Sequence, residues 1–173
     1  MIKSERVPDA TNAKPLQRAF FSSGTNRFAF VIPCDFTLDA SVPGKIILTS
    51  PDYTCFIAVQ LINFSGDGNG LVLESVRNLA LEEFPEGAIT REFDLHAANQ
   101  SGPAFEFQWK NSSGAHQAAC VGFVPSAAGM LKFSLLSNSE KYPESQMNFR
   151  CLLRSFQSNK EGKLEIPPVS GAS

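Results

Sequence analysis

The feature that most constrains this sequence is a series of four apolar segments, separated by short turns, that leads into an amphipathic helix. The predicted strands cover residues 88–97, 104–110, 116–124 and 130–137. Gly, Pro or Asn stands at the joints between them, as is typical of tight turns. Connections this short join antiparallel neighbours, so the four segments predict an antiparallel meander. Phe105, Phe107 and Trp109 alternate with polar residues, which indicates one buried face and one more polar face.

Two helices are predicted beside these strands. Residues 71–84 repeat apolar side chains with the period of a helix, and Pro85 and Gly87 end that pattern. The last helix is predicted over residues 143–158. Its apolar residues recur at the spacing of one helix face: Phe149, Leu152, Leu153 and Phe156. This stripe predicts that the last helix packs on the sheet.

The first half of the chain predicts three more strands, at residues 28–32, 45–49 and 54–62. A length of 173 residues is typical of one domain. We therefore expect a polar N-terminal extension (1–26), a single α+β domain (27–158) and a flexible C-terminal tail (159–173).

Three passages resemble a known fold family: Phe28–Pro33, Ile47–Asp52 with Ile57–Val59, and Tyr142–Phe156. Together with the order of the elements, they resemble the PsbP-like family, which includes photosystem II subunit PsbP, a Ran-binding nuclear import factor and bacterial DcrB-type proteins. The resemblance implies a central antiparallel sheet flanked by helices, an α/β/α sandwich. It also implies a non-enzymatic module that binds other proteins. No passage matches the functional motif of one branch, so no binding residue is transferred.

The cysteines do not form a recognisable metal or redox motif. Cys34, Cys55, Cys120 and Cys151 include no short pair such as CxxC, which argues against a zinc site. Cys55 and Cys120 stand in apolar runs, so we expect buried structural thiols. One disulfide and a reactive thiol are the alternatives. We expect no metal ion and no cofactor.

A glycine-rich joint at Gly66–Gly70 lies between a predicted strand and a helix, where a phosphate-binding loop would stand. Its spacing differs from GxGxxG and no Lys follows, so an ordinary turn is expected. Calcium binding at Asp67 and Asn69 is the alternative, although a calcium loop needs further oxygen ligands.

His96 and His116 are the only histidines, and neither has a Cys or His at ligand spacing. A nucleophile at Ser101 or Ser112, assisted by a histidine, is an alternative, but the sequence has no GxSxG elbow. We therefore expect histidines that are either on the surface or satisfied by ordinary hydrogen bonds, because a catalytic site needs several converging groups.

Two clusters are the candidate protein-binding residues. Glu82, Glu83 and Glu86 place acid at a helix end, where it opposes the helix dipole. They form either a solvated helix end or a docking patch for a basic partner. Met147 and Cys151 lie one turn apart, opposite the core stripe of the last helix. Either the N-terminal segment covers them, or they belong to a partner surface such as a homodimer face.

Charge and hydropathy restrict the remaining functions. The chain has 15 basic and 17 acidic residues, which argues against a nucleic-acid-binding surface. No segment has the apolar length of a membrane span, and residues 1–26 lack the apolar run of a signal peptide. A cytoplasmic protein is therefore expected, unless a signal peptide has already been removed.

We predict a non-enzymatic protein-interaction module, acting as an accessory subunit or adaptor. One alternative is a chaperone-like carrier that shields apolar segments of a client such as a secreted effector. The other is a small-ligand binder or hydrolase that uses His116. A charged patch would favour the first, an exposed apolar groove the second, and a deep polar pocket the third.

Overall fold

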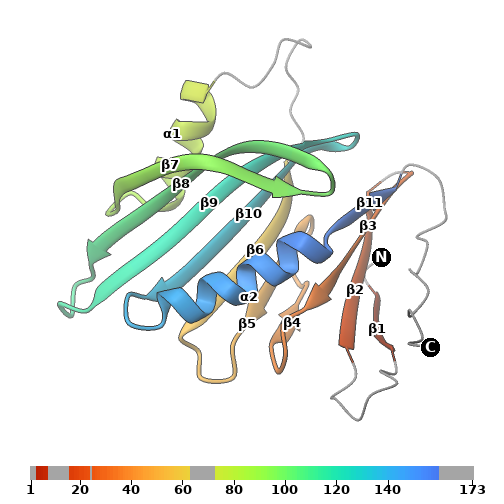
Figure 1. Ribbon diagram of the computed structural model, residues 1–173, viewed down its shortest axis with the longest axis horizontal. Helices are drawn as coiled ribbons and strands as arrows, with labels where there is room; N and C mark the ends of the chain where they lie inside the picture. Colours follow the sequence, from red (N-terminus) through yellow and green to blue (C-terminus); the bar gives the residue numbers. More distant parts are fainter. Residues whose placement is uncertain (1–2, 8–15, 24, 63–72, 160–173) are drawn as a thin grey trace, which may run out of the picture.

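The computed structural model describes residues 3–7, 16–23, 25–62 and 73–159 (Figure 1). Among these residues, the strands are β1 (Lys3–Val7), β2 (Leu16–Ser23), β3 (Asn26–Ile32), β4 (Thr37–Asp39), β5 (Lys45–Thr49), β6 (Cys55–Ile62), β7 (Ala88–Ala97), β8 (Gln100–Lys110), β9 (His116–Ser126), β10 (Gly129–Asn138) and β11 (Gln157–Asn159). The helices are α1 (Leu73–Glu83) and α2 (Tyr142–Ser155). Every strand and helix predicted from the sequence is present, with ends shifted by a few residues. The Gly66–Gly70 joint lies outside the described residues.

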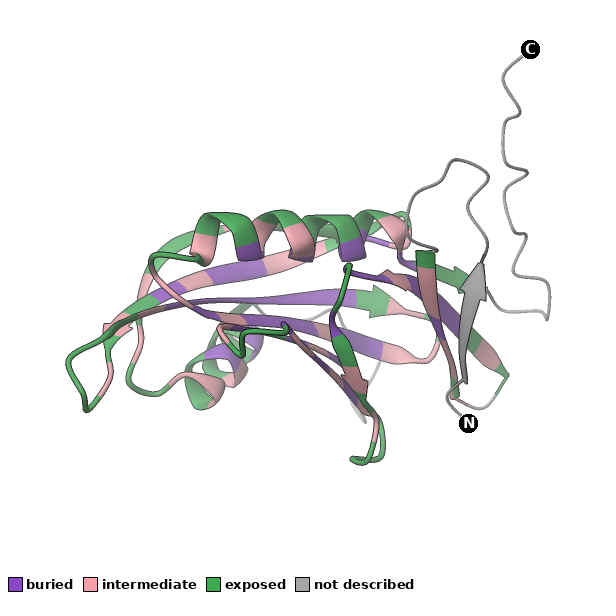
Figure 2. Cartoon of the chain, turned by 90° about the horizontal axis from the view of Figure 1, so that it is seen from below, coloured by how far each residue is buried: buried purple, intermediate pink, exposed green. Residues whose placement is uncertain are grey.

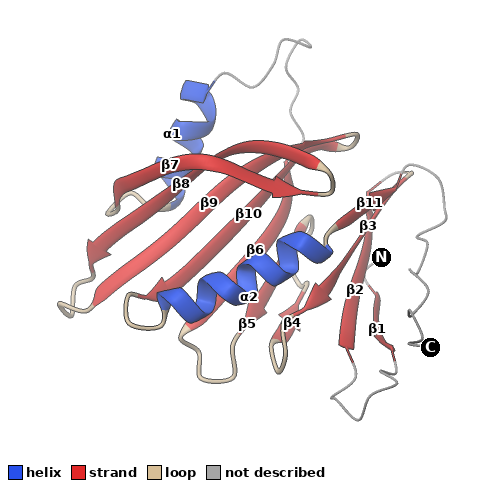
Figure 3. Ribbon diagram, viewed as in Figure 1, coloured by secondary structure: helices blue, strands red, loops and turns tan. Residues whose placement is uncertain are grey.

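The strands form two antiparallel sheets (Figure 3). The larger sheet has seven strands in the order β4-β5-β6-β10-β9-β8-β7. Its last four strands in sequence, β7 to β10, pair consecutively and antiparallel, which confirms the predicted meander. The smaller sheet has the order β1-β2-β3-β11.

The two helices pack on opposite faces of the large sheet (Figure 2). Alternation along β9 shows this division: Val121 and Phe123 belong to the cluster with Val76 of α1, whereas Cys120 and Val124 belong to the cluster with α2. The cluster on the α2 side includes the predicted stripe of the last helix: Phe149, Leu152, Leu153 and Phe156. The central antiparallel sheet is therefore as predicted.

The N-terminal segment differs from the prediction. Residues 1–26 were expected to be a polar extension, but β1 and β2 lie there, and β2 pairs with β3. The aromatic ring of Phe21 stacks on that of Phe28 with centroids 4.8 Å apart, and Ala19 is fully buried. A short apolar run thus becomes a strand because β3 offers it a template. The molecule is consequently richer in sheet than a helix-flanked α/β/α sandwich.

The last helix ends earlier than predicted. It stops at Ser155 rather than residue 158, and Phe156 has an extended backbone with φ −69° and ψ 125°. The Ser155 hydroxyl donates to the Leu152 carbonyl oxygen at 2.8 Å and accepts from the Val31 amide at 2.9 Å. The chain then pairs with β3 as β11. Of the predicted tail, residue 159 lies in β11, and residues 160–173 lie outside the described residues.

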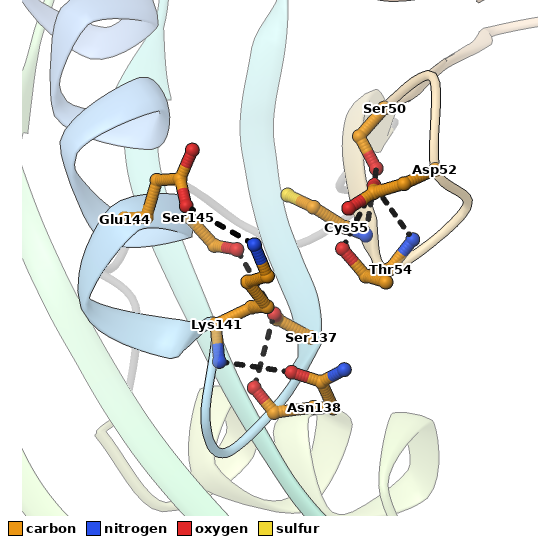
Figure 4. Close-up of polar contacts among 9 residues, drawn as sticks. All are labelled: Ser50, Asp52, Thr54, Cys55, Ser137, Asn138, Lys141, Glu144 and Ser145. Atoms are coloured by element: carbon orange, nitrogen blue, oxygen red, sulfur yellow. Dashed lines mark hydrogen bonds and ion pairs between the residues drawn. The ribbon is translucent and has the colours of Figure 1, made fainter.

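A polar junction holds the start of α2 against the large sheet (Figure 4). The Ser145 hydroxyl donates to the Ser137 hydroxyl of β10 at 2.9 Å, and both residues are buried. Beside them, the turn before β6 is organised by Asp52. Its Oδ1 accepts hydrogen bonds from the Ser50 hydroxyl at 2.7 Å and the Thr54 hydroxyl at 2.8 Å.

We predict that Phe156→Ala destabilises the protein by about 3–5 kcal/mol, because it removes a large buried side chain from the core. The Phe156 ring lies 5.8 Å from that of Phe30 and 5.0 Å from that of Phe133, measured between centroids. Denaturant unfolding measures the loss, and Phe56→Ala, at a partly exposed residue, should cost clearly less. A loss below about 1 kcal/mol would place Phe156 outside the core.

We also predict a contribution of Asp52 to stability that depends on pH. Hydrogen bonds from Ser50 and then Thr54 lower the pKa of Asp52 from 3.8 to about 2. A lowered folded-state pKa gives stabilisation that is complete above the unfolded-state pKa and is lost as pH falls through the folded-state pKa. Acid unfolding between about pH 4 and 2 should therefore be steeper in the wild type than in Asp52→Asn, which keeps an acceptor but does not titrate. Equal slopes would contradict this.

Candidate functional site

A cleft of about 260 Å³ opens between α2 and the edge strand β7, on the α2 side of the large sheet. We call it the α2–β7 cleft. Its lining consists of Arg91, Phe93, Asp94, Leu95, His96, Glu106, Cys120, Gln146, Phe149, Arg150, Leu153 and Arg154. Apolar rings and leucines form its walls, and charged groups stand at the floor and rim.

Two glycines allow β7 to form one wall of the cleft. A Cβ atom on Gly122 of β9 would lie 2.6 Å from Cδ1 of Leu95, and one on Gly102 of β8 would lie 1.8 Å from the Phe123 carbonyl oxygen. Real Cβ atoms do not approach neighbours this closely. The clash at Gly102 is with backbone, so that position requires glycine, whereas a side chain at Gly122 would displace Leu95. The β7–β8 hairpin can therefore bend across β9 and carry Leu95 into the core beside α2.

Glu106 anchors the floor of the cleft. Its Oε1 accepts a hydrogen bond from Nε2 of Gln146 at 2.6 Å, and its Oε2 lies 3.9 Å from Nη1 of Arg91. The Tyr142 hydroxyl donates to the Ala119 carbonyl oxygen at 3.2 Å and lies 3.5 Å from Glu106 Oε1. Glu106 therefore joins β8 to α2 and β7, and Tyr142 links this group to β9 through Ala119.

Two nucleophilic groups beside Glu106 are held in their protonated forms. Burial raises the pKa of the Cys120 thiol to about 12, with a further contribution from Glu106. Burial also raises the pKa of Tyr142, followed by the effects of Cys120 and Glu106. A protonated thiol is a poor nucleophile. Neither group is therefore activated for covalent or acid–base chemistry at neutral pH.

The rim of the cleft carries three arginines. The Arg91 guanidinium lies 4.8 Å from the ring centroid of Phe93, in cation–π geometry. Arg150 and Arg154 are exposed, and neither forms an ion pair or hydrogen bond with any residue that the structure describes. Two guanidinium groups are therefore free to bind an anionic partner.

The predicted acidic cluster lies away from this cleft, at the end of α1 on the opposite face of the sheet. Glu82 and Glu86 are exposed. Glu83 is instead half-buried, and its Oε2 pairs with Nζ of Lys132 at 2.7 Å. Of the three predicted carboxylates, Glu82 and Glu86 are therefore exposed to solvent, and Glu83 is engaged in an ion pair.

Met147 and Cys151 are both exposed, Met147 to 67%. At 100° per residue they adjoin Arg150 and Arg154 on the helix surface. The outer side of α2 is exposed along its length (Figure 2), and Met147 and Cys151 lie on it next to the arginines of the cleft rim. The sequence predicted Met147 and Cys151 but missed the arginines. Their spacing of four residues beside the core stripe was the available signal.

The histidines are both exposed, as expected, and the structure separates them. His96 lies on β7 at the edge of the cleft, opposite Ser101 on β8. His116 begins β9, near Ser112 of the preceding turn, and does not line the cleft. In the described ranges, no hydrogen bond joins either imidazole to a serine, and no three His, Cys, Asp or Glu residues converge as metal ligands. Within those same ranges, neither helix has the length and apolar character needed to span a membrane.

Comparison with solved structures identifies the fold. Cyanobacterial PsbP from Synechocystis sp. PCC 6803 aligns with a TM-score of 0.59 and 12% identity, over 88% of this chain and 97% of that one. The chain has the PsbP-like fold. LpqN of Mycobacterium tuberculosis, described as involved in cell envelope biogenesis, aligns at 0.50 and 13% identity, over 91% of each chain. The fold predicted by resemblance is therefore confirmed.

A third structure, from Bacteroides thetaiotaomicron, aligns with a TM-score of 0.49 and 14% identity, over 79% of this chain. The chain spans only 46% of the length of that protein. No family model matches the sequence, and no curated protein does.

We predict two rapidly reacting thiols in the folded PsbP-like chain. All four cysteines are free; Cys34 and Cys151 are exposed, whereas Cys55 and Cys120 are buried with raised pKa values. A chromogenic disulfide reagent should therefore modify two thiols quickly in the native protein and all four after unfolding. Cys151→Ser should remove one fast thiol. A Cys151 that stays unreactive in dilute monomer would show that its own chain buries it.

Proposed function

We propose that this chain is a non-enzymatic protein-interaction module, an accessory subunit or adaptor, whose binding face is the α2–β7 cleft and the adjoining outer side of α2. The observation that carries this proposal is a pair of guanidinium groups, Arg150 and Arg154, beside a strand edge; within the described residues, neither the two groups nor the edge has a partner. Groups arranged in this way can bind a partner without altering it chemically.

The chemistry of the cleft supports binding rather than catalysis. Its carboxylate, Glu106, is already held by Gln146 and Arg91, and its thiol, Cys120, stays protonated. General acid–base catalysis needs a group whose pKa is near the working pH and whose proton can reach a substrate. The raised pKa of Cys120 does not meet that requirement, and the Glu106 carboxylate is already engaged by Gln146 and Arg91. The PsbP-like fold supports the same proposal, because the family resemblance implies non-catalytic modules that bind other proteins.

The surface around the cleft has the composition of a protein interface. Arg and Met are enriched at interfaces, and aromatic rings act as anchors. Here Met147 stands one turn from Arg150 on the surface of α2, while Phe93 and Phe149 line the cleft.

The chaperone-like carrier is a second candidate, because the cleft walls include the apolar side chains Phe93, Leu95, Phe149 and Leu153. A carrier would accept many apolar segments, whereas an adaptor would accept one partner. The hydrolase that uses His116 has less support, since His116 lies outside the cleft.

Site-specific photo-crosslinking in cells of the source organism tests the proposal. A photoreactive amino acid replaces His96 or Met147 at the proposed face, Glu82 at the acidic end of α1, and exposed Ser113 as the matched control. We expect one discrete protein adduct from His96 and Met147 and none from Ser113. A broad set of adducts would favour the carrier. Adducts from Glu82 alone, or none at any position, would refute the proposed face.

A further inference from the structure

We propose that the α2–β7 cleft receives an extended acidic peptide segment, which pairs with β7 as an eighth strand of the large sheet and places its carboxylates on Arg150 and Arg154. This inference rests on the proposed function and states the chemistry of the partner. Strand addition draws its affinity from main-chain hydrogen bonds and its specificity from pockets for alternate side chains.

The first support is the open edge of β7. This strand is ten residues long and ends the seven-stranded order, so in the described part of the chain no strand pairs with its outer side. Edge strands present a row of unpaired N–H and C=O groups, which are a template for another strand. The cleft runs along this same edge, because residues 91 and 93–96 line it.

The hairpin geometry assigns the free backbone groups. Ala98 and Asn99 form a two-residue turn with φ of 51° and 61°, which matches a type I′ turn. Such a turn closes on a hydrogen-bonded pair, and hydrogen-bonded and non-hydrogen-bonded pairs then alternate along the strands. Counted back from the turn, Leu95 stands in a hydrogen-bonded pair with β8. Asp94 and His96 stand in non-hydrogen-bonded pairs, so their backbone amides point to the open edge. Asp94 and His96 accordingly border the cleft although their side chains alternate away from the core.

The second support is charge. On the cleft side, Arg91, Arg150 and Arg154 face one carboxylate, Glu106, which already has partners on α2 and β7. The other carboxylate of the lining is that of Asp94, whose side chain lies on the face of β7 that points away from the core. The cleft therefore has a surplus of positive charge, which complements an acidic segment.

The third support is spacing. Arg150 and Arg154 are four residues apart on α2, which is roughly 6 Å at 1.5 Å per residue. Residues that face the same side of a strand recur every two positions, about 6.6 Å apart. The helix and β7 both run from left to right in Figure 1, so the step along α2 from residue 150 to residue 154 has the same sense as the edge of β7. Two carboxylates at alternate positions of an added strand would therefore match the two arginines.

The apolar walls add a further requirement. Phe93 and Leu95 on β7 face Phe149 and Leu153 on α2 across the cleft. Leu95, Phe149 and Leu153 are buried in the core, and Phe93 is the partly exposed member of the set. A segment that carries carboxylates alone would leave the exposed part of Phe93 uncovered. We therefore expect apolar side chains beside the acidic ones at the positions that face the cleft.

Selection from random ten-residue peptides displayed on phage tests this chemistry on the full chain. We expect the enriched peptides to carry acidic residues at alternate positions next to apolar ones. Arg150→Glu together with Arg154→Glu should weaken the best peptide by about tenfold or more, while the matched change of both residues to Lys should weaken it much less. No enrichment, peptides without acidic residues, or equal binding to both double variants would overturn the proposal. So would free glutamate that binds as tightly as the peptide.

A backbone variant tests strand addition. Asp94→Pro removes the outward N–H, a change that edge strands tolerate, whereas Asp94→Ala removes the carboxylate and keeps the N–H. Circular dichroism first establishes that both variants are folded. We then expect only Asp94→Pro to lose about tenfold in peptide affinity. In the wild type, the peptide should slow hydrogen exchange at the amides of Asp94 and His96. If Asp94→Pro does not fold, that exchange measurement decides. Unchanged exchange refutes the added strand.

The outcomes separate this inference from the proposed function. A discrete crosslink from His96 or Met147, combined with a failed peptide selection, would refute the acidic strand and leave the interaction module in place. Adducts from Glu82 alone would move the binding face to the end of α1, and the absence of crosslinks from His96, Met147 and Glu82 alike would refute the interaction module itself.

Discussion

The structure depends on the burial of one helix stripe between two sheets. Phe156, at the end of α2, contacts Phe30 of the small sheet and Phe133 of the large sheet, so a single side chain belongs to both. The Ser155 hydroxyl reinforces this joint by accepting the Val31 amide of β3. The small sheet and the large sheet thus share one apolar core, and α2 is the element that connects them.

The same constraint positions the candidate site. With its apolar stripe fixed in the core, α2 can rotate very little, so the residues beside the stripe have defined directions. Gln146 donates a hydrogen bond to Glu106, and Arg150 and Arg154 line the rim of the cleft. The opposite wall depends on a separate condition, the absence of a side chain at Gly122, which lets Leu95 approach β9. The cleft therefore results from helix packing on one side and hairpin bending on the other.

These two conditions explain what the sequence could predict. The meander and both helices were predictable because their signals are local, in turn residues and in the periods of two and 3.6 residues. Strands β1, β2, β4 and β11 were not. β11 has three residues and becomes a strand only because β3, about 130 residues earlier in the chain, offers it a partner, whereas the polar segments of β1 and β2 carry little apolar alternation and are ordered by pairing with the strand that follows each of them. The exposed face of Met147 and Cys151 followed from helix geometry. The arrangement of Arg91 with Arg150 and Arg154 did not, since it depends on the bend of β7 over Gly122.

The charges on β7 also bear on which partner its edge accepts. Long open edges favour pairing with any available strand, and charged residues are a common protection. If two copies of β7 paired antiparallel about Asp94, that residue would face its own copy, and a slide of two residues, which centres the pair on Phe93, would place Asp94 opposite Glu92. Like charges directly opposite each other destabilise a strand pair. The edge is thus unfavourable for a second copy of this chain, whereas the arginines above it attract an acidic strand on the α2 side. A segment with carboxylates toward the cleft and neutral or basic side chains toward Asp94 complements the charges on both faces of this edge. A homodimer through this edge complements the charges on neither face.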